Sequence, residues 1–167
     1  MPTLNNKPNL MRARSLAKKL LREAKIIKPP IKLSDVSNHL GFQTIGITPQ
    51  ILKIKKNISA VVDLESKILL YNTENSTVRN RFSVAHEIGH FLLKHRFGTM
   101  NLFNLSSKDV REIEANMFAA ELLIPFDWVK NDLRDEMDVE KLAWKYWVSK
   151  DAMWWRISKS DSLLLNL

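Results

Sequence analysis

Residues 81–90 read RFSVAHEIGH, and the two histidines in this stretch are spaced for metal binding. His86 and His90 are four positions apart. Four residues of α-helix turn by about 400°, so both imidazoles project from one face, one turn apart, and can converge on a single Zn²⁺ ion. Glu87 follows the first histidine directly and is held beside the metal without ligating it. There its carboxylate can take a proton from water at the metal and pass it to a leaving amine, which makes Glu87 the candidate catalytic residue of a metal-dependent hydrolase.

The pattern predicts that this motif lies within a longer helix. Helical periodicity covers residues 77–95, and no proline interrupts it. Gly89 costs about 1 kcal/mol relative to alanine in a helix, which a close backbone approach at that point would explain. His95 is five residues beyond His90, about 140° further round the helix, which predicts a surface position facing away from the metal. His39 lies far away in the chain and is expected to be structural or exposed.

A catalytic zinc site needs a third protein ligand, which a second helix can supply. The metzincin pattern is excluded, because Leu93 and Arg96 stand where it requires glycine and histidine. Helical periodicity returns over residues 107–124, where two acids, Glu112 and Glu114, lie near the start. Their side chains point about 200° apart, so only one of them can face the metal. The apolar pattern leaves the choice between the two acids open.

The composition is that of an ordinary globular protein, and it excludes several kinds of functional site. Of the 167 residues, 45% are apolar, 26% are charged and none is cysteine, which excludes a disulfide scaffold, a Cys-ligated zinc finger and a thiol nucleophile. The N-terminus has no apolar run typical of a signal peptide, and no membrane span is predicted, so we expect a cytoplasmic protein. Histidine and glutamate remain as metal ligands. Such donors accept several divalent ions, and zinc is the expected cofactor.

The formal charge of +8 is concentrated in the first third of the chain. Residues 1–57 hold twelve Lys and Arg and two acidic residues, a net charge of +10, whereas residues 58–167 have a net charge of −2. Clustered cations favour direct binding to nucleic acid. The basic segment has a single aromatic residue, Phe42, and so lacks the stacking surface of single-strand binders. A solvated helix face is therefore the favoured interpretation.

The remaining periodicities predict an α+β fold. Residues 8–27 have the spacing of an amphipathic helix, and Ser34 is expected to cap a short helix that stops at Gly41. Short β-branched and apolar runs then predict a small, mostly antiparallel sheet of three or four strands, packed with zincin-type active-site helices. The strand at 67–72 is the candidate sheet edge for an extended substrate. The runs are 42–47, 52–55, 58–64 and 67–71, with a hairpin between the last two, and further helices are predicted at 139–147 and 150–158.

All five tryptophans lie after residue 127, in a short C-terminal helical part. They predict either a satellite core or an apolar groove for a partner protein, and the adjacent Trp154 and Trp155 cannot face the same way on a helix. Residues 142–158 also outline a helix-turn-helix, but its second helix is poorly suited to reading base edges. We therefore divide the chain into a basic N-terminal arm and helix (1–30), a catalytic domain (31–125) and a Trp-rich part of the same domain (126–167).

Two motifs occur in combination: RFSVA before HEIGH at residues 81–90, and E-x-x-A-N-x-F-A-A-x-L-L-x-P at residues 112–125. Together they resemble the ImmA/IrrE family of zinc metallo-endopeptidases, and the likeness covers most of residues 20–158. The resemblance implies that Glu112 is the third metal ligand, which leaves Glu114 as a solvated residue of the same turn. Asn116 lies one turn after Glu112 and could orient a metal ligand through its side-chain amide.

The resemblance also implies an intracellular zinc-dependent endopeptidase that hydrolyses peptide bonds in a protein substrate. Members of that family typically act on a helix-turn-helix transcriptional repressor, and so regulate a mobile element or stress genes. The alternatives are a DNA-binding regulator with a structural or sensory metal site, and a toxin or antitoxin-type module that binds a partner. The intact set of metal ligands with a general base beside it favours the peptidase. The sequence gives no indication of an oligomeric state.

Overall fold

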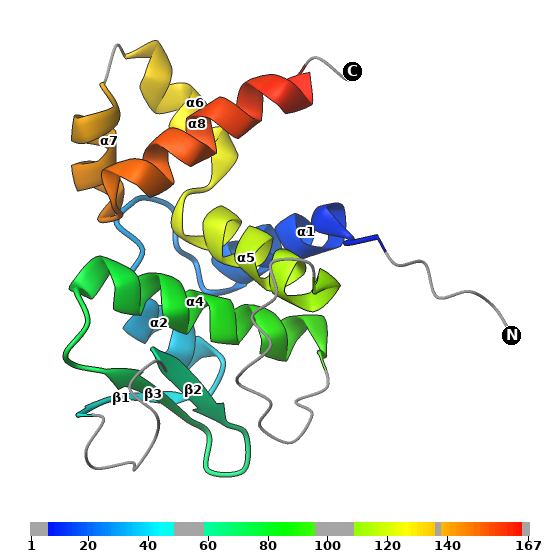
Figure 1. The fold of residues 1–167 in the computed structure, drawn as a ribbon, viewed down its shortest axis with the longest axis vertical. Coiled ribbons are helices and arrows are strands. Elements are labelled where there is room, and N and C mark those ends of the chain that lie inside the picture. The colour runs from blue at the N-terminus through cyan, green and yellow to red at the C-terminus, as the bar shows by residue number, and fades with distance from the viewer. Residues whose placement is uncertain (1–6, 49–58, 96–108, 136–137, 165–167) are drawn as a thin grey trace, which may run out of the picture.

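Two helices precede three strands and five further helices within the residues that the structure describes (Figure 1). This computed structural model describes residues 7–48, 59–95, 109–135 and 138–164, so the predicted strand at 52–55 lies outside the described residues. The α+β class is confirmed. Within those ranges no helix combines the length and apolar character needed to cross a membrane. The elements are α1 (Leu10–Glu23), α2 (Leu33–His39), β1 (Gln43–Ile47), β2 (Ala60–Asp63), β3 (Ile68–Asn72), α4 (Thr77–Leu93), α5 (Val110–Leu123), α6 (Phe126–Arg134), α7 (Val139–Tyr146) and α8 (Lys150–Leu164).

The three strands form one mixed sheet in the order β1-β3-β2. β2 and β3 are antiparallel neighbours, as the predicted hairpin requires, with Ala60 opposite Tyr71. β1 is parallel to β3, with Gln43 opposite Ile68. The prediction that residues 67–72 form a sheet edge is therefore wrong, because β1 occupies the side of β3 that the hairpin leaves free. The edges of the described sheet are β1 and β2.

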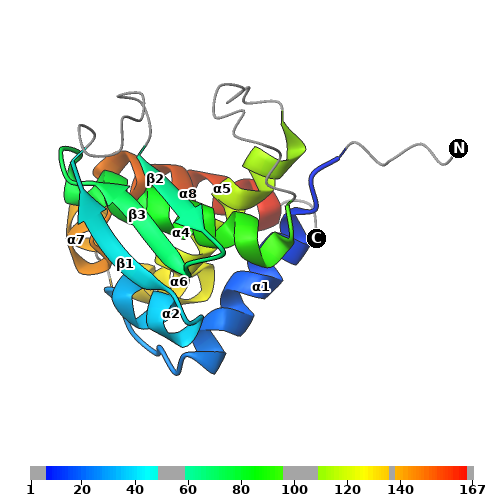
Figure 2. The same ribbon diagram turned by 90° about the horizontal axis from the view of Figure 1, so that it is seen from below.

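The helices lie in layers on one face of this sheet (Figures 1 and 2). α4 packs across β2 and β3, α5 packs on α4, and α1 packs on α5. α6, α7 and α8 form the outermost layer, at the top of Figure 1. The core passes through all the inner layers, with Leu69 of β3, Ile88 of α4, Phe118 of α5 and Ala17 of α1 buried. The sheet thus supports α4, and α4 in turn supports α5.

The end of α4 differs from the prediction. The helix stops at Leu93, and Lys94 adopts the left-handed conformation with φ +57°. The backbone N–H of His95 then donates to the carbonyl of His90 at 3.1 Å, a contact typical of a Schellman turn. The chain therefore folds back at His95 instead of continuing the helix.

Two other helix boundaries also differ. α2 begins at Leu33 with Lys32 as its cap residue and no side-chain cap, so Ser34 lies inside the first turn and the prediction that it caps the helix is wrong. His39 ends α2 and is exposed, as predicted. α6 is a helix that the periodicity missed. Pro125 ends the pattern of α5, but it is also the N-cap residue of α6, which starts directly after it.

Four of the five tryptophans are exposed, so the satellite-core interpretation is wrong for them. The interior of this part is built instead by Leu142, Tyr146 and Met153, each fully buried. Trp128 alone among the five is partly buried against the main core. Both members of the adjacent pair in α8, Trp154 and Trp155, are exposed. The exposed fractions are 81% for Trp144, 48% for Trp147, 62% for Trp154 and 41% for Trp155.

The side chain of Arg81 connects α4 to two segments that are distant in the sequence. Its side chain is buried, with Nη1 donating to the carbonyl of Ile31 at 2.8 Å and Nε donating to the carbonyl of Trp147 at 3.0 Å. The guanidinium also lies over the ring of Trp147, 4.8 Å from its centroid. Burial lowers the pKa of Arg81 to about 10, which still leaves it protonated at neutral pH. The carbonyls replace the water that this cation loses on folding.

Candidate metal centre

Three side chains from two helices meet at one point. His86 and His90 project from the same face of α4, and their Nε2 atoms are 2.9 Å apart. Glu112, in the first turn of α5, reaches both of them. Its Oε2 is 3.2 Å from Nε2 of His86, and its Oε1 is 3.2 Å from Nε2 of His90. One donor atom from each residue lies within 4.8 Å of the other two.

This arrangement fits a divalent metal ion of the zinc type. Tetrahedral ligands at about 2.0 to 2.1 Å from zinc are about 3.3 Å from one another, close to the separations between these three side chains. Two imidazoles and one carboxylate are also the donor set of catalytic zinc sites that keep one position open. The side chains of His86, His90 and Glu112 are 14%, 12% and 22% exposed, so the group is shielded but still accessible. The same donors accept other divalent ions.

Glu112 is held in the form that binds metal. Hydrogen bonds from His86 and His90 hold the pKa of its carboxyl well below the usual range. The start of α5 is fixed next to it, because the side chain of Asp109 caps the helix by accepting from the backbone N–H of Arg111 at 2.9 Å. Glu112 therefore enters the site as a carboxylate from an anchored first turn.

Glu87 lies beside the three residues without belonging to the group. Burial raises the pKa of its carboxyl, while the neighbouring His86 and His90 act in the opposite sense, and the net change is upward. A carboxyl with a raised pKa holds a proton closer to neutral pH. That property suits a group that takes up a proton and returns it within one reaction.

Asn116 supports the first histidine. Its Oδ1 lies 2.9 Å from Nδ1 of His86, one turn after Glu112 on α5. An amide oxygen only accepts, so Nδ1 of His86 carries a ring proton, and Nε2, which faces Glu112 and His90, is the atom that would ligate a metal. This is the orientation in which a histidine ligates a metal.

His95 and Glu114 lie near the site, although the sequence predicts both at the surface. Their side chains are only 9% and 11% exposed, and Nε2 of His95 is 2.8 Å from Oε2 of Glu114. Nδ1 of His95 is also 2.9 Å from Nδ1 of His90. The prediction for His95 fails because it extends α4 to residue 95, whereas the left-handed turn at Lys94 brings this side chain back. The prediction for Glu114 fails because the face opposite Glu112 packs against this histidine and is not solvated.

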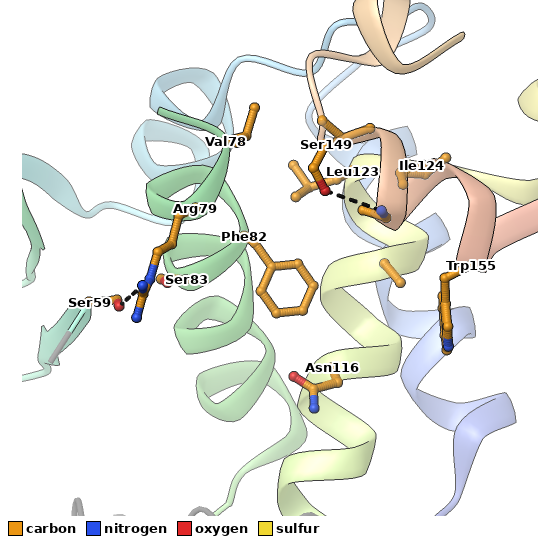
Figure 3. A pocket seen from close by; sticks show the side chains of 13 residues that line it. Ser59, Val78, Arg79, Phe82, Ser83, Asn116, Leu123, Ile124, Ser149 and Trp155 are labelled. Carbon is orange, nitrogen blue, oxygen red and sulfur yellow. Dashed lines mark hydrogen bonds between the residues drawn. The ribbon is translucent and has the colours of Figure 1, made fainter. Parts of the chain in front are cut away.

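A cavity of about 710 Å³ lies beside the site, between α4, α5 and α8 (Figure 3). Asn116 and Phe82 line it and also contact the metal centre, since the ring centroid of Phe82 is 6.3 Å from that of His86. Most of the wall is apolar. It includes Leu123 and Ile124 of the α5 end and Trp155 of α8. The sequence identifies the residues of the metal group, but no pattern in it predicts this cavity.

Similar proteins include a phage protein and a bacterial protein of known structure. "Uncharacterized immunity region protein 2" of Bacillus phage phi105 is 37% identical over 84 residues, covering 48% of this chain and 52% of the phage protein. The solved structure of a Mycobacterium tuberculosis transcriptional regulator matches with a TM-score of 0.62 over 86% of this chain and 45% of that chain. Its sequence identity is 14%, so this likeness concerns the fold alone. The chain spans about half the length of each of these relatives.

The family match covers most of the chain. The model of the M78 peptidase family, described as the IrrE N-terminal-like domain, matches residues 42–158. This range runs from the start of the sheet to α8 and contains both helices of the metal centre, whereas α1 lies outside it. The resemblance carried by the HEIGH and E-x-x-A-N motifs is thereby confirmed. The chain belongs to the M78 peptidase family and contains its IrrE N-terminal-like domain.

Proposed function

We propose that this protein is a zinc-dependent endopeptidase. The observation that supports the proposal is the convergence of His86, His90 and Glu112, with the carboxyl of Glu87 beside them, in a chain of a peptidase family. A site that only stabilised the fold would close all four positions of the metal and would need no ionisable group next to the ligands.

The proposed chemistry assigns one task to each side chain. A metal ion held by His86, His90 and Glu112 would polarise the scissile carbonyl and lower the pKa of a water molecule. Glu87 would take up the proton that this water releases and donate it to the nitrogen of the leaving amine. A carboxyl in this position can hold the proton until the amine needs it. Asn116 would keep Nε2 of His86 directed at the metal through its hydrogen bond to Nδ1.

We propose a protein substrate of the helix-turn-helix repressor class, and a role in regulating a mobile element or stress genes. The name of the phage relative, an immunity region protein, supports this choice. The substrate backbone would lie along β2, an edge of the described sheet. Ser59, directly before this strand, lines the cavity beside the metal centre.

The basic segment gives little support to the DNA-binding alternative. Nη2 of Arg12 donates to the carbonyl of Leu93 at 3.2 Å, and Nζ of Lys18 is 2.6 Å from Oδ2 of Asp127. These two cations of α1 are engaged with α4 and α6, which reduces the charge available for phosphate contacts.

The experiment is incubation of the zinc-loaded protein with a panel of purified helix-turn-helix repressors, with and without a chelator. We expect metal-dependent fragments from the wild type and none from Glu87→Gln at equal zinc content. Glu140→Gln is the matched control, because this glutamate is a surface acid on α7, 66% exposed, and should leave cleavage unchanged. Retained cleavage by Glu87→Gln would remove this residue from the role of base. Absence of cleavage together with salt-sensitive DNA binding would favour the regulator.

A further inference from the structure

The cavity beside the metal centre has an apolar wall that the roles assigned above do not use. Phe82 and Trp155 line it and are 37% and 41% exposed, although both are large apolar side chains. Leu123 and Ile124 lie in the same wall. Hollows lined by apolar and aromatic side chains with a few polar groups are typical of ligand sites.

We propose that this cavity binds a large apolar side chain of the substrate, next to the bond that is cleaved. The inference rests on the proposed peptidase function. Phe82 is one turn before His86 on α4, and Asn116 is hydrogen-bonded to the same histidine, so the cavity and the metal centre share a boundary. A side chain that enters the cavity places its own backbone beside the metal ligands.

Several polar atoms of the wall already have hydrogen-bond partners, which favours an apolar occupant. Nε of Arg79 donates to Oγ of Ser59 at 3.2 Å, and Oγ of Ser149 accepts from the backbone N–H of Ala152 at 3.1 Å (Figure 3). Oδ1 of Asn116 is hydrogen-bonded to His86. An aliphatic or aromatic side chain can fill the space without breaking these hydrogen bonds, whereas a cationic one would meet the guanidinium of Arg79 and no carboxylate among the lining residues.

The test uses a random peptide library and mass spectrometry of the products. We expect the wild type to cleave next to Phe, Leu, Met or Trp in preference to Ala or Gly. Ala152→Phe places a ring in the cavity from α8 and should lower kcat/KM at least tenfold for peptides with the large side chain, while peptides with Ala at that position keep theirs. Trp144→Phe is the control, since Trp144 is on α7 and is 81% exposed.

The outcomes separate this inference from the proposed function. Cleavage without any preference for apolar side chains overturns the inference and leaves the peptidase intact. Absence of cleavage in every peptide and repressor overturns both. If Ala152→Phe does not fold, Trp155→Ala removes part of the wall from the solvent side and should weaken the same preference; an unchanged preference in Trp155→Ala then overturns the inference.

A chain of hydrogen bonds connects the metal centre to the start of α1. Nδ1 of His90 is 2.9 Å from Nδ1 of His95, and Nε2 of His95 is 2.8 Å from Oε2 of Glu114. Oε1 of Glu114 accepts from the backbone N–H of Asn9 at 2.6 Å. Asn9 is the N-cap residue of α1, where its own side chain accepts from the backbone N–H of Arg12.

Only one placement of protons satisfies this chain when His90 ligates a metal. Nε2 of His90 faces the metal group, so the single proton of the neutral ring is on Nδ1 and is donated to Nδ1 of His95. His95 then carries its proton on Nε2 and donates it to the carboxylate of Glu114. Every donor in the chain has an acceptor, and the three side chains are largely buried.

We infer that His95 and Glu114 are positioning residues for the metal ligand His90. The hydrogen bond to Nδ1 fixes the ring of His90 and increases the electron density at its Nε2. The bond from Asn9 fixes Glu114 in turn, which makes the start of α1 part of the support of the site. α1 lies before the region matched by the family model, so this support comes from outside it.

The test is zinc affinity by chelator competition, with the thermal midpoint of the metal-free protein measured in parallel. Glu114→Gln keeps the shape of the side chain but replaces one carboxylate oxygen by an NH₂ group. This group cannot accept a hydrogen bond, so Gln at position 114 loses either the bond from His95 or the bond from the backbone N–H of Asn9. We expect zinc affinity to fall about 10- to 100-fold in Glu114→Gln and in His95→Ala. His95→Gln, which retains an acceptor, should recover part of the loss. The visible spectrum of the cobalt-loaded variants should also change, because the geometry at His90 is altered.

A loss of stability without a loss of zinc affinity would overturn this inference. If Glu114→Gln and His95→Ala lower the thermal midpoint of the metal-free protein but leave zinc affinity and the cobalt spectrum unchanged, the chain is only structural and the inference is overturned. Because Glu114→Gln is nearly isosteric, it tests the inference even if His95→Ala does not fold.

Discussion

Phe118 of α5 packs so closely against Gly89 of α4 that a Cβ at position 89 would lie 3.0 Å from Cδ1 of the phenylalanine ring. A close approach at this glycine is therefore present, but it comes from the side chain of Phe118 and not from a backbone segment. Gly89 directly precedes the metal ligand His90, and Phe118 is two residues after Asn116. The contact therefore sets how far Glu112 stands from the two histidines.

Gly89→Ala should lower the free energy of unfolding by about 1 kcal/mol. Overpacking against the ring costs about 2 kcal/mol, and the better helix propensity of alanine offsets about 1 kcal/mol of this. Urea denaturation of the metal-free protein measures the difference. Zinc affinity should fall as well, since α5 must move away from α4. A variant as stable as the wild type would mean that the ring of Phe118 shifts without cost.

Asn116→Ala should weaken zinc binding about tenfold, because His86 loses the acceptor that fixes its ring and its tautomer. Chelator competition gives the affinity. Asn131→Ala, a change at an exposed asparagine of α6, is the matched control. Equal affinities in the two variants would show that His86 needs no partner at Nδ1.

Glu112→Gln should weaken zinc binding by at least ~100-fold, beyond the range typical of residues that act only through a ligand. The substitution removes the negative charge that complements the metal and replaces a strong donor by a neutral amide. The comparison is with Glu114→Gln, for which a smaller loss is expected. If Glu114→Gln has the larger effect, the ligand assignment moves from Glu112 to Glu114.

Arg156→Met should lower the free energy of unfolding by about 3 to 5 kcal/mol. Arg156 pairs with Glu121 where both side chains are almost fully buried, and its Nε donates to the carbonyl of Ile124 at 2.9 Å. Removal of the cation leaves the carboxylate of Glu121 without its closest partner in the interior. Lys19→Met breaks an exposed pair with Glu23 instead and should cost about 0.5 kcal/mol or less. Urea denaturation distinguishes the two; similar costs would contradict the burial argument.

The sequence predicts the metal-binding helix because its information is local. Two histidines four apart, a glutamate between them and an uninterrupted apolar periodicity require nothing beyond α-helical geometry. The choice between Glu112 and Glu114 is of another kind, since it depends on how α5 rotates against α4. Helical projection leaves that rotation open, and only the family motif indicates Glu112.

The features that the sequence does not predict depend on single backbone angles or on distant pairings. Lys94 takes a left-handed conformation that usually favours glycine, so nothing in the sequence signals that His95 returns to the site. The parallel pairing of β1 with β3 joins two strands that have β2 between them in the sequence, and periodicity carries no information on strand order. The exposed tryptophans show the same limit, because composition alone cannot assign a helix face.

Arg81 also affects which parts of the protein unfold together. Its guanidinium donates hydrogen bonds to the carbonyls of Ile31 and Trp147. Local unfolding of α7 would break the bond to Trp147 and leave this buried cation of α4 with one acceptor fewer. Such an opening carries the penalty of an unpaired interior charge. We therefore expect the amides of α7 and of the first turns of α4 to exchange with solvent hydrogen as one cooperative unit, although more than forty residues separate these two helices in the sequence.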